Sequence, residues 1–530
     1  MFSEKSEKIL TAAAAVLGGC TIAAGIGTGI LRHSVKDLQQ KIHQQEAALH
    51  QTQNPGGAAS DKEKTASASG TSDAKKTPSA SEGKTLSADM VREAYPFSGG
   101  YAVVFGQDQN YYILDTEGNV TGTLPGFTDQ TGNISAGDTD FYNGYALVAS
   151  ERKGPLLIDS GGQILLDGSA LSVETSCTSA LRYGCLAVRD SSKALCAYDV
   201  ETGACTPLPG NTALGEPVGG GWFQGSDPEG KPLLVDLKTG KTVDLLGEPA
   251  AKELPDPASE TGNAVGTVPG WADGVLTVQY YVNEMTDAGE EISVGITAYW
   301  DAGSGQFIKI SDLPERIVAA TENEIILQYD VSYSDYLSTP YAGMLSVWHK
   351  DTGKTDDTEV SPDDNIQCVG YYDGKFMVQT SKLEGDALVT LMDQDGKFLF
   401  EPIRGSFRAV CGSHALIGGP EMLAGTNSFH TYIVNLDTYD IQKFDSASVF
   451  TESAAGGIIY AAPDCKEYPV WILQYGGNVF ECYDLLTGKP VSARDVPMTS
   501  HKFPECADGV LLVDNVYYGR NGKLLKEQGN

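Results

Sequence analysis

Short apolar runs that end in a sharp turn recur along most of this chain. Residues 231–247, KPLLVDLKTGKTVDLLG, carry an apolar run, an aspartate, a glycine four positions later and a second run that alternates apolar and polar residues. Aspartate accepts hydrogen bonds from the N–H groups of a turn, and glycine adopts the positive φ that a tight reversal requires. The pattern therefore predicts a β-hairpin, and related stretches stand at ten places between residues 111 and 524.

The residue at the end of the first run is aspartate in seven of the ten stretches. These aspartates are Asp115, Asp159, Asp199, Asp236, Asp301, Asp393 and Asp484. His349, Asn435 and Gly519 take that place in the other three, and a glycine follows three or four positions later in nine. We therefore interpret these residues as turn formers and not as catalytic or calcium-binding groups.

A second glycine, which opens another apolar run, precedes each of the first four hairpins at a constant distance. The pairs Gly100–Asp115, Gly144–Asp159, Gly184–Asp199 and Gly221–Asp236 are each fifteen residues apart. One further short strand fits before each glycine, so every unit has about four strands in roughly 45 residues, which is typical of β-propeller blades. The sequence predicts an all-β fold, a β-propeller of about ten four-stranded blade-like units within residues 89–530.

The arrangement of these units is left open by the sequence. One ring, two smaller rings and partly open arcs all satisfy the repeat. The proline-rich residues 247–270 are either a boundary between four units and six or a long loop.

The N-terminal part predicts attachment to a membrane. Residues 9–31 contain no charged side chain and lie between Lys8 and Arg32, and about 20 apolar residues suffice to cross a bilayer as a helix. We interpret residues 1–33 as a cytoplasmic tail and one transmembrane anchor. The alternative is a lipoprotein signal, because VLGGC resembles a lipobox in which Cys20 would be lipidated, although the residues after Cys20 remain apolar.

Two further segments separate the predicted anchor from the repeats. Residues 34–53 carry apolar residues at helical spacing and predict a short juxtamembrane helix. Residues 54–88 are rich in Ala, Ser, Lys and Gly and predict a disordered tether. Charges on the two sides of the anchor do not decide its orientation. The tether is typical of the stalks of bacterial surface proteins, so we expect a single-pass protein of the bacterial cell membrane with the large domain extracytoplasmic.

Charge and cysteine usage exclude several classes of partner. Of the 37 Lys/Arg and 70 Asp/Glu, ten and eight lie in residues 1–88, which leaves a balance of −35 in the repeats. Such a field repels phosphate backbones, so we expect no nucleic-acid partner. No C-x-x-C pair occurs and the histidines are scattered, so we expect no metal site. A local disulfide within Cys177, Cys185, Cys196 and Cys205 is left open.

Two known families share features with these units. VDLKTGK and YDLLTGK resemble the blade turn of PQQ-type propellers. FYNGYALVASERKGPLLIDSGGQILLD is similar to a WG-repeat unit of bacterial surface proteins, although the Trp-Gly pair is absent. The resemblance covers about residues 95–526 and implies the propeller fold. No motif matches the cofactor ligands of PQQ enzymes, so the resemblance implies no cofactor.

Three units depart from the average and define a candidate site. Units five, six and nine contain extra residues, which we place between the second and third strands, so that the additions gather on one rim. Tyrosine supplies contact area at low entropic cost, so a tyrosine-rich insertion is a candidate contact surface. The ligand-binding candidates are Tyr329, Tyr333, Tyr336, Tyr341, Glu290 and Glu291. The alternative is a longer hairpin whose tyrosines pack on one another.

The functional prediction follows from these features. No nucleophile elbow, zinc-helix motif or phosphate loop occurs in the sequence. We therefore expect a membrane-tethered, extracytoplasmic, non-catalytic binding or assembly module for protein or glycan. The alternative is a propeller-fold enzyme that acts on polysaccharide, because the abundant carboxylates could supply a catalytic pair.

Overall fold

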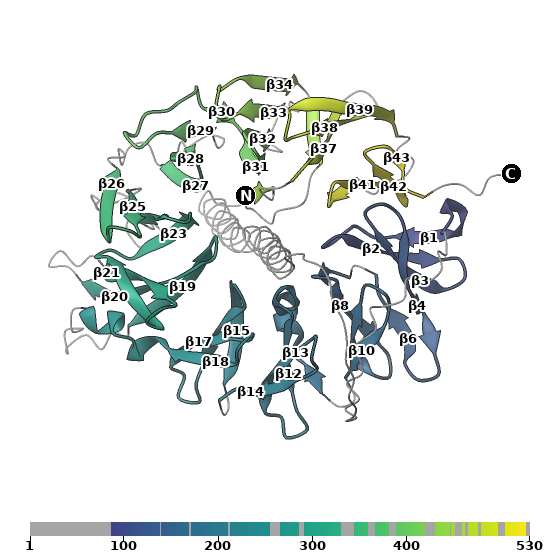
Figure 1. Ribbon diagram of the computed structural model, residues 1–530, viewed down its shortest axis with the longest axis horizontal. Helices are drawn as coiled ribbons and strands as arrows, with labels where there is room; N and C mark the ends of the chain where they lie inside the picture. Colours follow the sequence, from purple (N-terminus) through teal and green to yellow (C-terminus); the bar gives the residue numbers. More distant parts are fainter. Residues whose placement is uncertain are drawn as a thin grey trace, which may run out of the picture.

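Ten β-sheets stand side by side around a central axis in the computed structural model (Figure 1). The structure describes residues 86–525, except 138, 169–170, 210–211, 255–264, 286–290, 330–343, 359–365, 381–387, 419–429, 446, 451–457, 462–464, 475–478 and 497–503. The expected all-β propeller of ten units is confirmed, and the ten blades form one ring.

Blades one to five make up the first half of the ring. Blade one contains η1 (Ala88–Met90), β1 (Val91–Ala94), β2 (Tyr101–Gly106), β3 (Asn110–Asp115) and β4 (Val120–Pro125). Blade two contains β5 (Phe127–Thr128), β6 (Gly132–Ser135), β7 (Phe141–Tyr142), β8 (Tyr145–Ser150), β9 (Gly154–Asp159) and β10 (Ile164–Asp167). Blade three contains β11 (Ser172–Val173), η2 (Thr175–Tyr183), β12 (Cys185–Arg189), β13 (Leu195–Asp199) and β14 (Cys205–Pro207). Blade four contains β15 (Ala213–Gly219), β16 (Trp222–Ser226), β17 (Pro232–Asp236) and β18 (Lys241–Asp244), followed by η3 (Leu245–Gly247) and η4 (Ala250–Glu253). Blade five contains β19 (Gly266–Ala272), β20 (Val275–Met285), β21 (Glu291–Asp301) and β22 (Gln306–Ser311).

Blades six to ten complete the ring. Blade six contains β23 (Glu315–Ala320), β24 (Glu324–Tyr329), β25 (Leu345–His349) and β26 (Lys354–Thr358). Blade seven contains β27 (Ile366–Tyr372), β28 (Lys375–Thr380), β29 (Leu388–Met392) and β30 (Ile403–Arg404). Blade eight contains β31 (Ser406–Cys411), β32 (His414–Gly418), β33 (His430–Asn435), β34 (Ile441–Asp445) and the added β36 (Ile459–Tyr460). Blade nine contains β35 (Ala447–Phe450), β37 (Pro469–Gln474), β38 (Val479–Asp484) and β39 (Lys489–Asp495). Blade ten contains β40 (Glu505–Ala507), β41 (Val510–Val513), β42 (Val516–Gly519) and β43 (Gly522–Lys523).

Most blades are simple antiparallel meanders whose first strand lies innermost. Figure 1 shows β23, β27 and β31 near the centre and β26 and β34 at the outer edge. Successive first strands contact one another, as β15 does with β19 and β19 with β23. Apolar side chains fill the space between adjacent sheets, so each blade buries its faces against its neighbours.

The predicted role of the turn aspartates is confirmed. The Asp115 carboxylate accepts hydrogen bonds from the N–H groups of Glu117 (3.1 Å) and Asn119 (2.8 Å). The same pattern recurs in blade seven, where Asp393 accepts from Asp395 (3.1 Å) and Lys397 (2.8 Å). The glycines that follow have positive φ, for example +84° at Gly118. The hairpin turn is thus encoded locally in each blade.

Blades four and five, which flank residues 247–270, pack directly on each other. Trp222 and Leu234 of blade four share one core cluster with Leu276 and Phe307 of blade five. The Glu248 carboxylate also accepts a hydrogen bond from the N–H group of Phe307 (2.9 Å). These contacts join the two blades in the same way as other neighbours in the ring.

In the described part of the chain, side chains close the ring between blades ten and one, and neither blade contains a strand from the other. The Tyr517 hydroxyl donates to the carbonyl oxygen of Tyr95 (2.5 Å) and accepts from its N–H group (3.1 Å). The Asp508 carboxylate accepts from the N–H group of Gly100 (2.8 Å). Phe97 and Tyr517 pack edge to face, with ring centroids 5.2 Å apart. The first and last blades therefore meet through one buried seam.

Blade nine differs from the sequence prediction. Its extra residues, 451–468, lie between the first strand β35 and the second strand β37, and not between the second and third strands. Asp484 accepts from the N–H group of Tyr468 (2.8 Å), which fixes the start of β37 at Pro469. Gly457 precedes an apolar run, as the glycines that open second strands do in other units, but the residues that follow it enter β36, which pairs with blade eight.

Two further predictions concern a disulfide in blade three and a transmembrane helix. None of the nine described cysteines forms a disulfide bond, so the local disulfide of blade three is not formed in this structure. None of the helices in the described part is long and apolar enough to cross a membrane. The predicted anchor, the juxtamembrane helix, Cys20 and the tether up to residue 85 lie outside the described residues.

Candidate functional site

The meander topology gives the ring two unlike faces. In an antiparallel blade, the connections between strands one and two and between strands three and four emerge on the same side. We call this side the turn face. The connection between strands two and three emerges on the opposite side, together with the segment that leads to the next blade. We call that side the loop face.

Most of the turn face is built from short, closely similar turns, and the exceptions are η2 of blade three and residues 451–468 of blade nine. Between the first and second strands, pairs such as Asp273–Gly274, Asp373–Gly374 and Asp508–Gly509 have positive φ at both residues, which is the conformation of a tight two-residue hairpin. Between the third and fourth strands stand the aspartate-capped turns described above. Repetition of the same local chemistry makes this face the scaffold side of the ring.

The loop face varies from blade to blade. Only residues 107–109 join the second and third strands of blade one, and residues 151–153 do so in blade two. The corresponding connections are residues 330–344 in blade six, 381–387 in blade seven and 419–429 in blade eight. In blade five, β20 and β21 are themselves extended. On the loop face, blades five to eight therefore carry the largest departures from the repeat, and we take this part of the loop face as the candidate site.

The structure describes two of the predicted site residues on this face, Tyr329 at its base and Glu291 at the end of the extended hairpin of blade five. Tyr329 ends β24, is 4% exposed, and its N–H group donates to the carbonyl oxygen of Met344 (3.1 Å). Glu291 begins β21 opposite Met285. Blades five and six are neighbours, so the two residues stand on the same stretch of rim. The other candidates, Glu290, Tyr333, Tyr336 and Tyr341, lie outside the described residues.

A buried carboxyl group lies beneath this stretch and was missed from the sequence. Glu315 pairs with Tyr329 across β23 and β24 and is 1% exposed. The Ser346 hydroxyl contacts one Glu315 oxygen at 2.7 Å and the Asp357 carboxylate at 3.1 Å. Burial raises the pKa of Glu315, the hydroxyls of Ser311 and Ser346 oppose that rise, and Asp357 adds to it.

The position of Glu315 limits what it can do chemically. Its side chain has almost no exposed surface, so it can hold a proton inside blade six but cannot touch a ligand on the rim. The only sequence signal is a charged residue at the start of an apolar run, ERIVAA, and many exposed glutamates begin strands in the same way.

A polar network fixes blade six against blade seven below the rim. The Arg316 guanidinium donates to Gln328 Oε1 (2.7 Å) and to the carbonyl oxygen of Cys368 (2.8 Å). Gln328 in turn donates to the carbonyl oxygen of Ile366 (3.0 Å). Because these groups are mostly buried, the two blades that flank the candidate site are held in a fixed relation.

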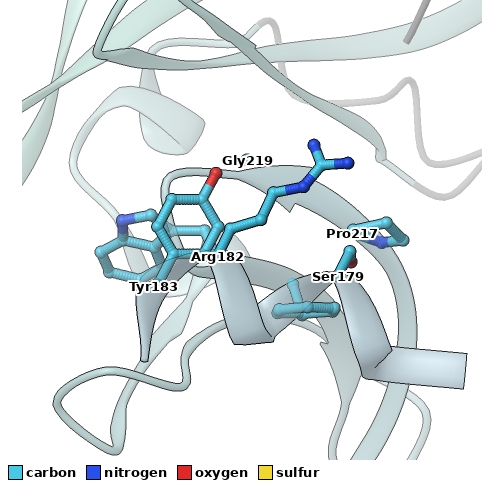
Figure 2. Close-up of a pocket in the computed structure, with 7 residues that line it drawn as sticks. Ser179, Arg182, Tyr183, Pro217 and Gly219 are labelled. Atoms are coloured by element: carbon cyan, nitrogen blue, oxygen red, sulfur yellow. The ribbon is translucent and has the colours of Figure 1, made fainter. Parts of the chain in front are cut away.

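A small depression lies on the turn face, between blades three and four (Figure 2). It is lined by Ser179, Arg182, Tyr183, Pro217, Gly219, Trp222 and Phe223. The Tyr183 hydroxyl accepts from the N–H group of Gly220 (2.7 Å), and the Arg182 guanidinium lies 4.7 Å from the centre of the Tyr142 ring. These contacts join η2 to the blades on either side of it. Among the described residues, no group of three His, Cys, Asp or Glu side chains could hold a metal ion.

Comparison with known proteins supplies no family. No family model and no curated protein matches the chain. A computationally designed protein, Ika8, is 13% identical over 83% of this chain and 96% of its own, with a TM-score of 0.26. BamB from Moraxella catarrhalis is 13% identical over 66% and 82%, with a TM-score of 0.25. The β-propeller domain of the Trilobed protease from Pyrococcus furiosus is 9% identical over 64% and 88%, with a TM-score of 0.28. At these scores the likenesses carry no argument, and the class of fold rests on the ten blades.

Proposed function

We propose that this protein is a membrane-tethered, extracytoplasmic binding or assembly module that takes a protein or glycan partner on the loop face of blades five to eight. The observation that carries the proposal is the contrast between the two faces of the ring. The turn face repeats short turns except in blades three and nine, whereas the loop face carries its longest connections and its extended strands in four adjacent blades, five to eight. Variable connections on a rigid scaffold are where binding residues concentrate.

The chemistry of the connections favours a contact surface. The connection of blade six contains Tyr333, Tyr336 and Tyr341, and aromatic side chains supply large contact area at low entropic cost. The acidic balance of the repeats favours a neutral or basic partner over a polyanion. The non-catalytic part of the proposal rests on the sequence, in which no catalytic motif was found.

The membrane part of the proposal rests on residues 9–31 and on the composition of residues 54–88. By random-coil scaling, a tether of about 35 residues spans roughly 30 to 35 Å, so the ring would stand clear of the bilayer surface. Protease added to intact cells should cut in this tether and release the ring. Complete protection, in cells whose wall admits the protease, would contradict the extracytoplasmic location. Cys20→Ser tests the lipoprotein alternative, because it abolishes lipidation and leaves an apolar anchor in place.

The binding part is tested with the full chain. Protein partners are isolated from membrane extracts, and glycan partners are identified on a glycan array. The affinity of the double variant Tyr333→Ala/Tyr336→Ala for the partner found is then compared with that of the parent protein. We expect a loss of at least about tenfold, which equals about 1.4 kcal/mol.

The matched control lies on the turn face. Asp236→Ala removes a carboxylate that accepts from the N–H group of Lys238 (2.9 Å) and from the Thr239 hydroxyl (2.6 Å). This change should lower the free energy of unfolding by roughly 1 kcal/mol and leave the affinity of the folded protein unchanged. The reverse pattern would show that scaffold and site are assigned to the wrong faces. Turnover of a bound glycan would contradict a non-catalytic role.

A further inference from the structure

Residues 458–461, which we call the strap, lie on the inner edge of blade eight. Within the strap, β36 pairs in parallel with β31, in the register Ala409 to Ile459 and Val410 to Tyr460. The N–H group of Ala461 extends this pairing to the carbonyl oxygen of Val410 (2.7 Å). The chain of blade nine thus supplies an additional strand to blade eight.

The strap is anchored in two cores. Ile458 is 3% exposed and belongs to the apolar cluster of blades seven and eight. Ile459 is also 3% exposed and belongs to the cluster of blades eight and nine. The strap therefore contacts three consecutive blades. A covalent bond that holds the strap in place would also stabilise the packing of these blades on one another.

Two thiols meet just beyond the strap. Cys411 is the last residue of β31 and is 1% exposed, and Cys465 follows the strap by four residues and is partly exposed. Both side chains belong to the cluster between blades eight and nine, and their thiols are in hydrogen-bonding contact. Neither forms a disulfide bond in this structure.

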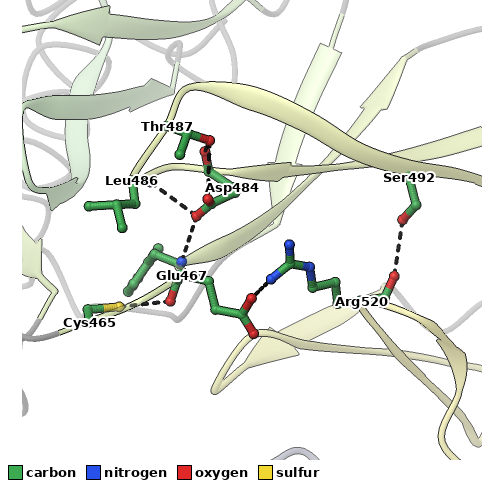
Figure 3. A network of polar contacts seen from close by, with 8 residues as sticks. Cys465, Glu467, Asp484, Leu486, Thr487, Ser492 and Arg520 are labelled. Carbon is green, nitrogen blue, oxygen red and sulfur yellow. Dashed lines mark hydrogen bonds and ion pairs between the residues drawn. The ribbon is translucent and has the colours of Figure 1, made fainter.

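The backbone around Cys465 is held in place on its other side (Figure 3). The Cys465 thiol contacts the carbonyl oxygen of Glu467 at 2.7 Å, and the Glu467 carboxylate forms an ion pair with Arg520 of blade ten. The next residue, Tyr468, donates its N–H group to Asp484 (2.8 Å). These contacts hold the backbone around Cys465 in place, so that its thiol stays beside Cys411.

We propose that Cys411 and Cys465 form a disulfide bond when the protein meets a disulfide oxidant, and that this bond fastens the strap to blade eight. The geometry distinguishes this pair from the others. Cys196 and Cys205 lie on adjacent strands of one hairpin, so a bond between them would add no link between blades. Cys177 and Cys185 are both fully buried, whereas an oxidant can reach Cys465.

The reaction is a pair of thiol–disulfide exchanges. The Cys465 thiolate attacks one sulfur of glutathione disulfide, the S–S bond breaks, and one glutathione thiolate leaves. The Cys411 thiolate then attacks the Cys465 sulfur of the mixed disulfide and releases the second glutathione. The protein loses two protons and two electrons, and two glutathione thiols are formed. Burial, together with the neighbouring Cys465 thiol, raises the pKa of Cys411 to about 12, so we expect the second step to be the slower one.

The test uses the full chain, incubated under native conditions with glutathione disulfide or with dithiothreitol. Free thiols are then alkylated, and the digested protein is mapped by mass spectrometry. We expect one linked peptide pair that contains Cys411 and Cys465, and a mass lower by about 2 Da for that bond. The bond closes a long loop, so the oxidised protein should unfold about 5 °C higher, and dithiothreitol should reverse the rise.

Two variants sharpen the result. Cys465→Ser should abolish both the linked peptide and the rise in Tm. Under reducing conditions, this variant and the parent protein should have the same Tm. Cys205→Ser, at an exposed cysteine of blade three, should retain both. The proposal is overturned if Cys411 remains fully alkylatable after oxidation and unfolding, or if the rise in Tm persists in Cys465→Ser. The peptide map of the parent protein decides the question even if a variant fails to fold.

Discussion

At the scale of single residues, Glu315 is a carboxyl group buried inside blade six. Its carboxyl group is held by Ser346 within blade six, close to the Asp357 carboxylate, and burial raises its pKa. The folded chain therefore binds this proton more tightly than the unfolded chain does. Linkage then requires that the contribution of Glu315 to the free energy of unfolding falls as pH rises above the ordinary glutamate pKa.

Glu315→Gln removes this titration. The variant should gain stability relative to the parent protein as pH is raised from about 4 to about 8, because the parent must then bury a charge or bind a proton. Urea unfolding at a series of pH values measures the difference. Glu322→Gln, at an exposed glutamate of the same blade, is the control and should show no such trend. A difference between Glu315→Gln and parent that is independent of pH would contradict the assignment.

At the scale of elements, the strap depends on a notch in blade seven. An added Cβ atom at Gly370 would lie 2.0 Å from the Tyr460 hydroxyl oxygen and 3.2 Å from Ile458 Cδ1. The Tyr460 hydroxyl also lies 3.6 Å from Met377 Sδ. Only glycine at position 370 therefore leaves room for the tyrosine that β36 presents to blade seven.

Gly370→Ala should displace Tyr460 and lower the free energy of unfolding by roughly 1 to 3 kcal/mol. In the Tyr460→Phe background, which lacks the hydroxyl, the same substitution should cost less, and a double-mutant cycle by urea unfolding measures the coupling. Equal costs in the two backgrounds would show that Tyr460 does not occupy the notch.

Elements also show where prediction from sequence succeeds and where it fails. The hairpins were predictable because Asp115 and Asp393 cap turns within four residues of themselves, so the signal is local. The path of blade nine was not predictable. Gly457 has the sequence appearance of a glycine that opens a second strand, yet the residues after it pair with β31, and the notch that receives Tyr460 is formed by another blade.

The candidate site was also predictable only in part. The sequence located the extended connections of blades five and six, because insertions interrupt a constant spacing. It missed residues 419–429 of blade eight, which contain no tyrosine, and it missed Glu315, whose burial depends on side chains that arrive from Ser346 and Asp357. Contacts of this kind require the packed blade and leave no periodic signal in the chain.

At the scale of the whole molecule, closure of the ring depends on the seam between blades ten and one. Tyr517 is 1% exposed, and its hydroxyl bonds both backbone polar groups of Tyr95 across the seam. Every other neighbouring pair of blades is also joined by a covalent connection, whereas these two are the ends of the repeat. The seam is therefore the place where the ring is expected to open first.

Tyr517→Phe should lower the midpoint of urea unfolding, by an amount equivalent to about 1 to 2 kcal/mol, because the Tyr95 carbonyl oxygen loses its donor. Hydrogen exchange should then rise first in β1, β2 and β42. Tyr518→Phe, on the side of the strand that packs against blade nine, is the matched control and should have a smaller effect. Faster exchange spread evenly over all blades would contradict the seam as the weakest interface.

The central claim is that the partner binds the loop face and not the turn face. The most direct measurement replaces one residue on each face with a photo-crosslinking amino acid in the full chain and irradiates intact cells. Position 336 reports on the connection of blade six, and position 201 reports on the exposed turn of blade three. We predict a specific adduct from position 336 and none from position 201. An adduct that forms only from position 201, or equally from both, would contradict the assignment of the binding face.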